Sequence, residues 1–133
     1  MSISALSIGI SGMQAAEARL NAASSNIANV RTAGSLDPNA GPAPYQPIDA
    51  VSVDIGSGLS GVMTSYQPRN SKPVAVSDPD SGYADANGMV GMPDIDIASE
   101  MVSALMARYE FAASAKMVGI ASDMQKTATD ILA

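Results

Sequence analysis

All eight prolines of this 133-residue chain lie in its middle, between Pro38 and Pro93. Proline lacks a backbone donor and clashes with the preceding helical turn, so it is rare inside helices. Two long proline-free segments remain, one at each end of the chain, and most of the glycines fall between them. This distribution predicts a helix, an irregular or β-rich middle, and a second helix.

The first proline-free segment, from about Ser2 to Val30, has apolar residues spaced by three and four positions. They are Ile3, Leu6, Ile10, Met13, Ala16, Leu20, Ala23, Ile27 and Val30. Four of them, beginning with Leu6 and ending with Ile27, recur at every seventh position. This spacing is typical of a helix in a coiled coil.

The second proline-free segment follows Pro93. Asp94 or Asp96 can cap its first turn, and Glu100 lies near the positive end of the helix dipole. Its apolar line is Ala98, Val102, Leu105, Tyr109, Ala113, Met117, Ile120, Met124, Ala128 and Ile131. We therefore predict a mainly α fold. Two terminal helices, in residues 1–32 and 96–133, pair as a coiled-coil-like antiparallel hairpin, with a small irregular β-rich middle segment in residues 33–95.

The middle segment contains one clear strand pattern. Residues 50–55 alternate apolar and polar side chains, which indicates a half-buried strand. Residues 59–66 and 73–76 are weaker candidates, and residues 78–82 and 86–88 have the composition of turns.

Composition disfavours most chemical functions. The chain has no Cys and no His, which removes thiolate chemistry, the commonest general base and the usual zinc ligands. Thirteen acidic residues stand against seven basic ones, so no basic surface is available to neutralise nucleic-acid phosphates. We expect no enzyme activity, no cofactor, no metal, no nucleic-acid partner and no small-molecule substrate.

Two short motifs have ordinary interpretations. Gly56 to Gly61 matches G-x-G-x-x-G, but a strand pattern stopped by Pro68 follows it, where dinucleotide binding requires a helix. A flexible hairpin turn is therefore the better interpretation. The acidic residues between Asp78 and Asp96 do not match a calcium-binding EF-hand and are expected to be a solvated loop.

The first helix has unusually few charges. Among the first thirty residues only Glu17 and Arg19 are charged, and the remaining faces carry small or neutral side chains. A helix with one face in water usually carries several charges there. The apolar stripes are also thin for the entropy that ordering two long helices costs. We infer that contacts between copies or with related chains add the missing burial; a solvated Ala/Ser-rich face in a small two-helix protein is the alternative.

Both ends of the chain resemble the flagellar axial proteins of the rod, hook and hook-associated class. The N-terminal resemblance rests on Ser4-Ala5-Leu6, Gly12-Met13-Gln14, Arg19-Leu20, Ser25-Asn26-Ile27-Ala28-Asn29-Val30 and Thr32. A second set of residues resembles the FlgC-type proximal rod proteins more narrowly. It comprises Tyr83-Ala84-Asp85-Ala86-Asn87-Gly88-Met89-Val90, Met92-Pro93-Asp94-Ile95-Asp96 and Glu100-Met101-Val102.

The resemblance implies a structural subunit of the proximal rod of the bacterial flagellar basal body. Such a subunit would assemble helically with copies of itself and other rod proteins and transmit motor torque. It would leave the cell unfolded through the flagellar type III export apparatus, without a cleavable signal peptide, and lie in the periplasm-spanning rod. A free-standing coiled-coil adaptor or secretion chaperone, and a neighbouring rod or hook axial protein, are the alternatives.

The predicted assembly interface follows the apolar lines of both helices, which we expect to pack within the chain and between chains. Its residues are Leu6, Ile10, Met13, Leu20, Asn26, Ile27, Asn29, Val102, Leu105, Tyr109, Ile120 and Met124. For Asn26 and Asn29, polar contacts near the helix end and simple C-terminal capping are equally compatible with the sequence.

Overall fold

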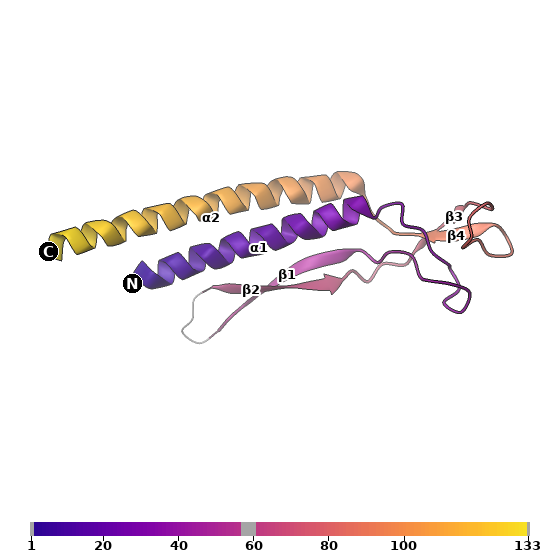
Figure 1. Ribbon diagram of the computed structural model, residues 1–133, viewed down its shortest axis with the longest axis horizontal. Coiled ribbons are helices and arrows are strands. Elements are labelled where there is room, and N and C mark those ends of the chain that lie inside the picture. The colour runs from indigo at the N-terminus through magenta and orange to yellow at the C-terminus, as the bar shows by residue number, and fades with distance from the viewer. Residues whose placement is uncertain (1, 57–60, 133) are drawn as a thin grey trace.

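The computed structural model describes residues 2–56 and 61–132 as two long helices and two small strand pairs. Helix α1 spans Ser2–Ala28 and helix α2 spans Ile97–Leu132. The two helices run antiparallel and side by side, so that both termini lie at the same end of an elongated molecule (Figure 1). The prediction of terminal helices around a β-containing middle is confirmed, although the helices make up only about half of the chain.

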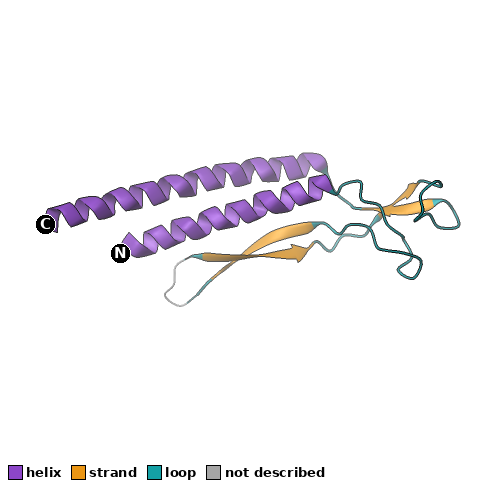
Figure 2. Ribbon diagram, viewed as in Figure 1, coloured by secondary structure: helices purple, strands orange, loops and turns teal. Residues whose placement is uncertain are grey.

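The middle segment forms two antiparallel pairs of strands (Figure 2). Strand β1 (Ile48–Asp54) pairs with β2 (Val62–Pro68), and this hairpin lies along α1. Strand β3 (Val74–Ser77) pairs with β4 (Met89–Met92) at the end of the molecule far from the termini. The first three strands were predicted to within a few residues, whereas β4 was missed.

The G-x-G-x-x-G motif joins β1 to β2. Its outer glycines, Gly56 and Gly61, have φ values of 72° and 144°, a region that favours glycine. The predicted hairpin turn is confirmed to the extent that these residues join two antiparallel strands; residues 57–60 of the turn lie outside the described part of the chain. A strand follows the motif, which is not the helix that a dinucleotide fingerprint needs.

Helix α2 begins at the predicted cap. The Asp96 carboxylate accepts a hydrogen bond from the Ala98 N–H at 3.1 Å, and the Glu100 N–H donates to the Asp96 carbonyl at 3.0 Å. An aspartate that accepts from the N2 amide satisfies one of the four free donors at a helix start. Of the two predicted caps, Asp96 is therefore the one used, while Asp94 lies in the preceding loop.

Small residues form the contact between the two helices. Among the helix residues whose burial the structure describes, 5–28 and 97–131, every buried apolar one is an alanine: Ala15, Ala16, Ala22, Ala23, Ala107 and Ala121. Gly9 is also buried, and a Cβ added to it would lie 2.6 Å from Cγ2 of Val118. Such side chains let two helices approach closely but bury little apolar area.

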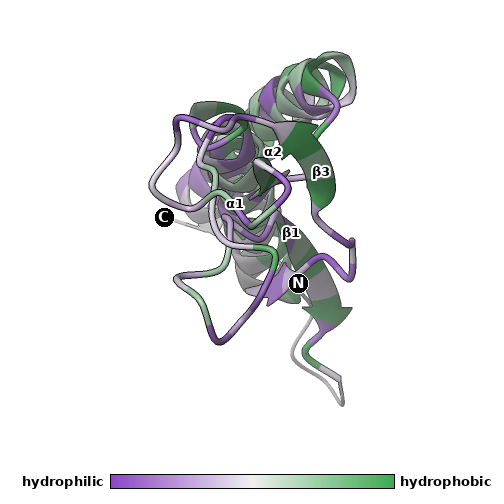
Figure 3. Ribbon diagram, turned by 90° about the vertical axis from the view of Figure 1, so that its right-hand side faces the viewer, coloured by the Kyte–Doolittle hydropathy of each residue, from purple (hydrophilic) through white to green (hydrophobic). Residues whose placement is uncertain are grey.

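Many of the large apolar residues of the two helices are exposed in the single chain. Seven of the predicted interface residues are exposed: Ile10, Leu20, Val102, Leu105, Tyr109, Ile120 and Met124. Hydrophobic residues also lie on the side of α2 turned away from α1, as the end-on view shows (Figure 3). Within the described residues, the largest side chains that are almost fully buried are those of Val90 and Asn26.

In residues 2–56 and 61–132, no helix is long and apolar enough to span a bilayer. Over the same ranges, no group of three or more acidic residues is arranged to hold a metal ion.

Candidate functional site

Asn26 fixes the start of the β1–β2 hairpin against the last turn of α1. Its side chain is 0% exposed, donates through Nδ2 to the Ile48 carbonyl at 2.9 Å, and accepts at Oδ1 from the Ile48 N–H at 2.9 Å. The same Oδ1 accepts from the Tyr45 hydroxyl at 3.0 Å, and this hydroxyl also lies 3.0 Å from Oγ of Ser25. The Asn26 amide thus pairs with Ile48 as a neighbouring strand would.

Asn29 caps the C-terminal end of α1, which is the second of the two roles that the sequence allowed. Its Nδ2 donates to the Ser25 carbonyl at 2.9 Å, and its Oδ1 accepts from the Thr32 hydroxyl at 3.1 Å. The Ser25 carbonyl also accepts from the backbone N–H of Asn29 at 3.1 Å, so the side chain adds a second donor to a carbonyl in the last turn of α1. Asn29 therefore caps α1, whereas Asn26 makes tertiary contacts. In the single chain Asn26 is wholly buried, so its side chain is already fully engaged by its own chain.

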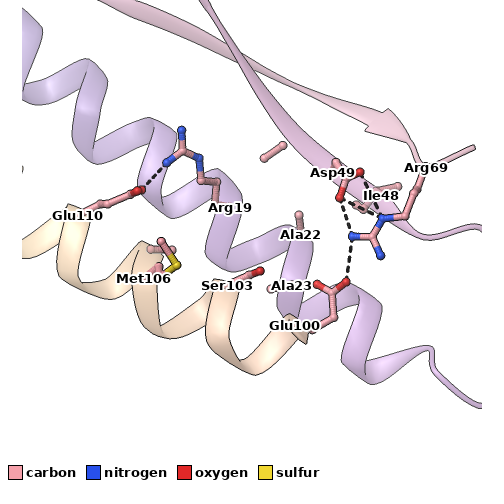
Figure 4. Close-up of a pocket in the computed structure, with 12 residues that line it drawn as sticks. Arg19, Ala22, Ala23, Ile48, Asp49, Arg69, Glu100, Ser103, Met106 and Glu110 are labelled. Atoms are coloured by element: carbon pink, nitrogen blue, oxygen red, sulfur yellow. Dashed lines mark hydrogen bonds and ion pairs between the residues drawn. The ribbon is translucent and has the colours of Figure 1, made fainter. Parts of the chain in front are cut away.

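Arg69 joins the hairpin to the beginning of α2 (Figure 4). Its Nη2 donates to Asp49 Oδ1 at 2.6 Å and to Glu100 Oε1 at 2.9 Å, and its Nε lies 3.2 Å from both Asp49 oxygens. Glu100 is only 4% exposed. The hydrogen bonds to Asp49 raise the pKa of the Arg69 guanidinium above its usual value; burial opposes this rise and the hydrogen bond to Glu100 adds to it. The Arg69 guanidinium therefore stays charged at every pH that a folded protein meets.

A second ion pair joins the two helices. Arg19 donates from Nη1 to Oε2 of Glu110, and both side chains are about two-fifths exposed (Figure 4). Pairs exposed to this degree are screened by water and typically contribute less than about 1 kcal/mol. The Arg19–Glu110 ion pair therefore helps to set the register of the two helices but adds little to the free energy of their packing.

Between the hairpin and the helix pair lies a groove of about 360 Å³, which the two ion pairs flank (Figure 4). Alanines from both helices and Met106 form much of its wall. Its three carboxylates, Asp49, Glu100 and Glu110, are each paired with an arginine. The charge of each carboxylate in the groove is thus already compensated by an arginine. These ion pairs hold the hairpin and the two helices together.

A line of exposed apolar side chains runs along α2, and we name it the outer stripe. Its residues are each more than half exposed: Val102, Met106, Tyr109, Met117, Ile120, Met124 and Ile131. They recur at spacings that place them on one side of the helix. Exposed apolar surface of this extent usually marks a site of protein interaction.

A second apolar feature, the seam groove, lies between α1 and α2. Two adjoining hollows of about 330 and 320 Å³ share Leu20 and Arg108. The lining is Ala16, Glu17, Leu20 and Ile27 from α1, and Met101, Ala104, Leu105, Ala107, Arg108 and Phe111 from α2. Leu6 and Met13, half-buried, continue the same face of α1 at heptad spacing. Of the four residues at heptad spacing on α1, Leu20 and Ile27 therefore line the seam groove, and the other two lie on the same face of the helix.

Sequence reasoning missed the polar residues that attach the hairpin. Asp49, Arg69 and Tyr45 were not singled out, and Glu100 was assigned only to the helix dipole. The scarcity of charge in α1 was a usable signal for Arg19, because a lone arginine on an otherwise neutral helix often has a specific partner. No comparable pattern identifies Arg69.

Comparison with known proteins matches residues 6–34 to the family model described as flagella basal body rod protein. The flagellar basal-body rod protein FlgC of Salmonella typhimurium is 32% identical over 124 residues, which cover 90% of each chain. The protein of the same name from Agrobacterium fabrum is 29% identical over 130 residues, covering 92% of this chain and 88% of the relative. The chain therefore belongs to the FlgC family of flagellar basal-body rod proteins, which are structural subunits.

Proposed function

We propose that this chain packs side by side with copies of itself and with other rod proteins in the proximal rod, through the outer stripe and the seam groove. One observation carries the proposal: the helices bury alanines against each other and leave their large apolar side chains exposed. In an isolated subunit that surface costs free energy at about 25 cal/mol for each Å² of apolar area. Contact with neighbouring helices removes the cost.

Neighbouring helix pairs would form a coiled-coil layer, in which heptad residues such as Leu20 and Ile27 insert between side chains of adjacent subunits. The remaining members of the predicted interface fit the same assignment. They are Leu6, Ile10, Met13, Asn29, Val102, Leu105, Tyr109, Ile120 and Met124. Torque would pass between subunits through this layer, while Asn26 and Arg69 hold each hairpin in place on its own helices.

The thin core supports a further part of the proposal. Because one chain alone buries few large side chains, it is easily kept unfolded, which suits export through the flagellar type III apparatus. Folding of the terminal helices would then be completed by assembly in the periplasm-spanning rod.

Electron microscopy of basal bodies tests the proposal. A strain that lacks the gene is expected to form membrane rings without a rod, and the intact gene should restore the rod. Leu20→Asp and Ile120→Asp should fail to restore it although the protein is made, because each buries a charge in a subunit contact. Asn21→Asp and Gln125→Asp, which add the same charge at exposed polar positions of the same helices, should restore it. Complete rods in the deletion strain would overturn the proposal. Complete rods with both Leu20→Asp, in the seam groove, and Ile120→Asp, in the outer stripe, would do so too.

A further inference from the structure

We propose that the seam groove of one copy receives the C-terminal part of the outer stripe, from Met117 to Ile131, of a second copy. This inference rests on the proposed role as a rod subunit and adds which surface meets which. In this arrangement the seam groove of one copy contacts the outer stripe of the next copy.

The groove has the form that a helix ridge fits. It runs along the line where α1 and α2 meet, with the alanines Ala16, Ala104 and Ala107 and larger side chains such as Leu20 and Leu105 in its lining. Among the described residues, none from the β1–β2 hairpin lines it. A helix from a second copy can therefore reach the seam groove without displacing any part of the copy that receives it.

The C-terminal part of α2 is the segment of this chain best suited to fill the groove. Helix α2 has 36 residues against 27 in α1, and its end extends beyond the N-terminal end of α1 (Figure 1). Met124 is 65% and Ile131 78% exposed, so its own chain does not cover this end. Ile120, Met124 and Ile131 are spaced by four and seven residues and present one narrow ridge.

Charge supports this occupant. Arg108 lines both hollows of the seam groove, whereas Glu17 lines only one of them, and Asp123 lies beside Ile120 and Met124 of the ridge. Among the described residues, neither Arg108 nor Asp123 forms an ion pair within its own chain. Seating the ridge in the groove lets these opposite charges approach at its edge, which favours one orientation of the incoming helix.

The contact has a direction because groove and ridge are different parts of the same chain. An interface of this heterologous kind leaves a free groove at one end of a pair and a free ridge at the other. Further copies can therefore add, and the series closes into a ring or continues as a helix. A groove-to-groove or ridge-to-ridge contact would instead stop at two copies.

Disulfide crosslinking in isolated basal bodies tests the assignment. The chain has no cysteine, so introduced cysteines are the only ones that can link its copies. A disulfide needs Cβ atoms within about 4.5 Å of each other. Mild oxidation of a strain with both Leu20→Cys and Met124→Cys in one chain should give dimers, trimers and higher products. Cells that make the two single variants together should give dimers only.

Three comparisons decide the result. Each single variant alone should give no dimer, and Asn21→Cys paired with Met124→Cys should give at least tenfold less dimer than Leu20→Cys does. Leu105→Cys serves as a second groove position if Leu20→Cys prevents assembly. Dimers from Leu20→Cys alone, or no crosslink between copies in intact basal bodies, would overturn the inference while leaving the proposed function in place. Absence of the chain from the rod would contradict the proposed function itself.

Discussion

Helix α1 is attached to its two neighbours by opposite kinds of chemistry. Against α2 it presents small residues such as Gly9, which faces Val118, and Ala16, which lies near Ala107, with one half-exposed ion pair between Arg19 and Glu110. Against the β1–β2 hairpin it presents Asn26, which is fully buried and bonded through both ends of its amide. Packing of small side chains is non-directional, whereas an amide with paired donor and acceptor accepts a single alignment.

The difference indicates where the chain fixes its own structure and where it leaves structure to its neighbours. The hairpin is held by hydrogen bonds that are satisfied within the chain; in the described residues no buried side-chain polar atom lacks a partner. The helix pair, by contrast, keeps its large apolar side chains for outside contacts. Loss of a polar contact at the hairpin should therefore cost the isolated chain more than a comparable change between the helices.

The largest effect is expected at the buried amide. Asn26→Leu keeps the approximate shape of the side chain but leaves the Ile48 N–H and carbonyl without partners, and each buried unpaired group costs about 1–3 kcal/mol. We expect a loss of about 3 kcal/mol in the free energy of unfolding, measured by urea denaturation. Asn29→Leu, which removes only a helix cap, should cost less than about 1 kcal/mol. Equal losses would remove the distinction between the two asparagines.

The next effect compares two ion pairs. Glu100→Gln removes the charge of a buried carboxylate bonded to Arg69, and we expect a loss of about 1–2 kcal/mol, reduced by the partial exposure of Arg69. Glu110→Gln changes the half-exposed pair between the helices and should cost less than about 1 kcal/mol. Urea denaturation of both variants at one ionic strength measures the difference. A larger loss for Glu110→Gln would mean that the helix pair depends on its ion pair.

Local sequence signals predicted the elements well, and tertiary contacts account for what was missed. Proline placement and the spacing of side chains located both helices, the two aspartates of which one caps α2, and three strands, because these depend on neighbours in the chain. Strand β4 was missed because its four residues include Gly91, a poor strand former, and because its partners lie elsewhere in the sequence: β3 on one side and Gly34, through an isolated bridge, on the other. The same limit applies to Arg69, whose partners are 20 and 31 residues away.

Apolar spacing predicted the antiparallel helix pair but did not distinguish contacts within the chain from contacts between chains. Heptad spacing locates an apolar face but does not say whether that face meets the partner helix of the same chain or another chain. Here the alanines between the large residues form the internal contact, and Leu20 borders a groove. The scarcity of charge on α1 indicated additional neighbours, whereas the preference for small residues between the helices is visible only in three dimensions.

A smaller effect tests the close approach of the helices. Gly9→Ala places a methyl group 2.6 Å from the stiff, β-branched Val118, so the overpacking should outweigh the gain in helix propensity and cost about 1 kcal/mol. Gly119→Ala meets nothing within 4 Å and should stabilise the chain by about 0.5–1 kcal/mol. Thermal unfolding followed by circular dichroism should show shifts of opposite sign. Stabilisation by both would indicate that the helices can separate without cost.

The smallest effect extends the comparison to the turn between β3 and β4, which a polar side chain also fixes. The Asp85 carboxylate accepts from the N–H groups of Asn87 at 2.7 Å and Met89 at 3.0 Å. These bonds, first the one from Met89, lower the pKa of Asp85 below its usual 3.8. Since the folded pKa is the lower one, the stabilisation is fully present above about pH 4 and is lost as pH falls through the lowered value.

Amide NMR shifts of Asn87 and Met89 should therefore move in acid below the usual pKa of an aspartate, while shifts in the alanine contact between the helices should not follow the same titration. Asp85→Asn keeps an acceptor oxygen but cannot titrate, so the acid-dependent shift of the Met89 amide should disappear. If the shift persists in Asp85→Asn, another carboxylate controls this turn. If the alanine contact titrates together with it, the strand pairs and the helix pair respond as one unit, and the separation between them drawn from their chemistry does not hold.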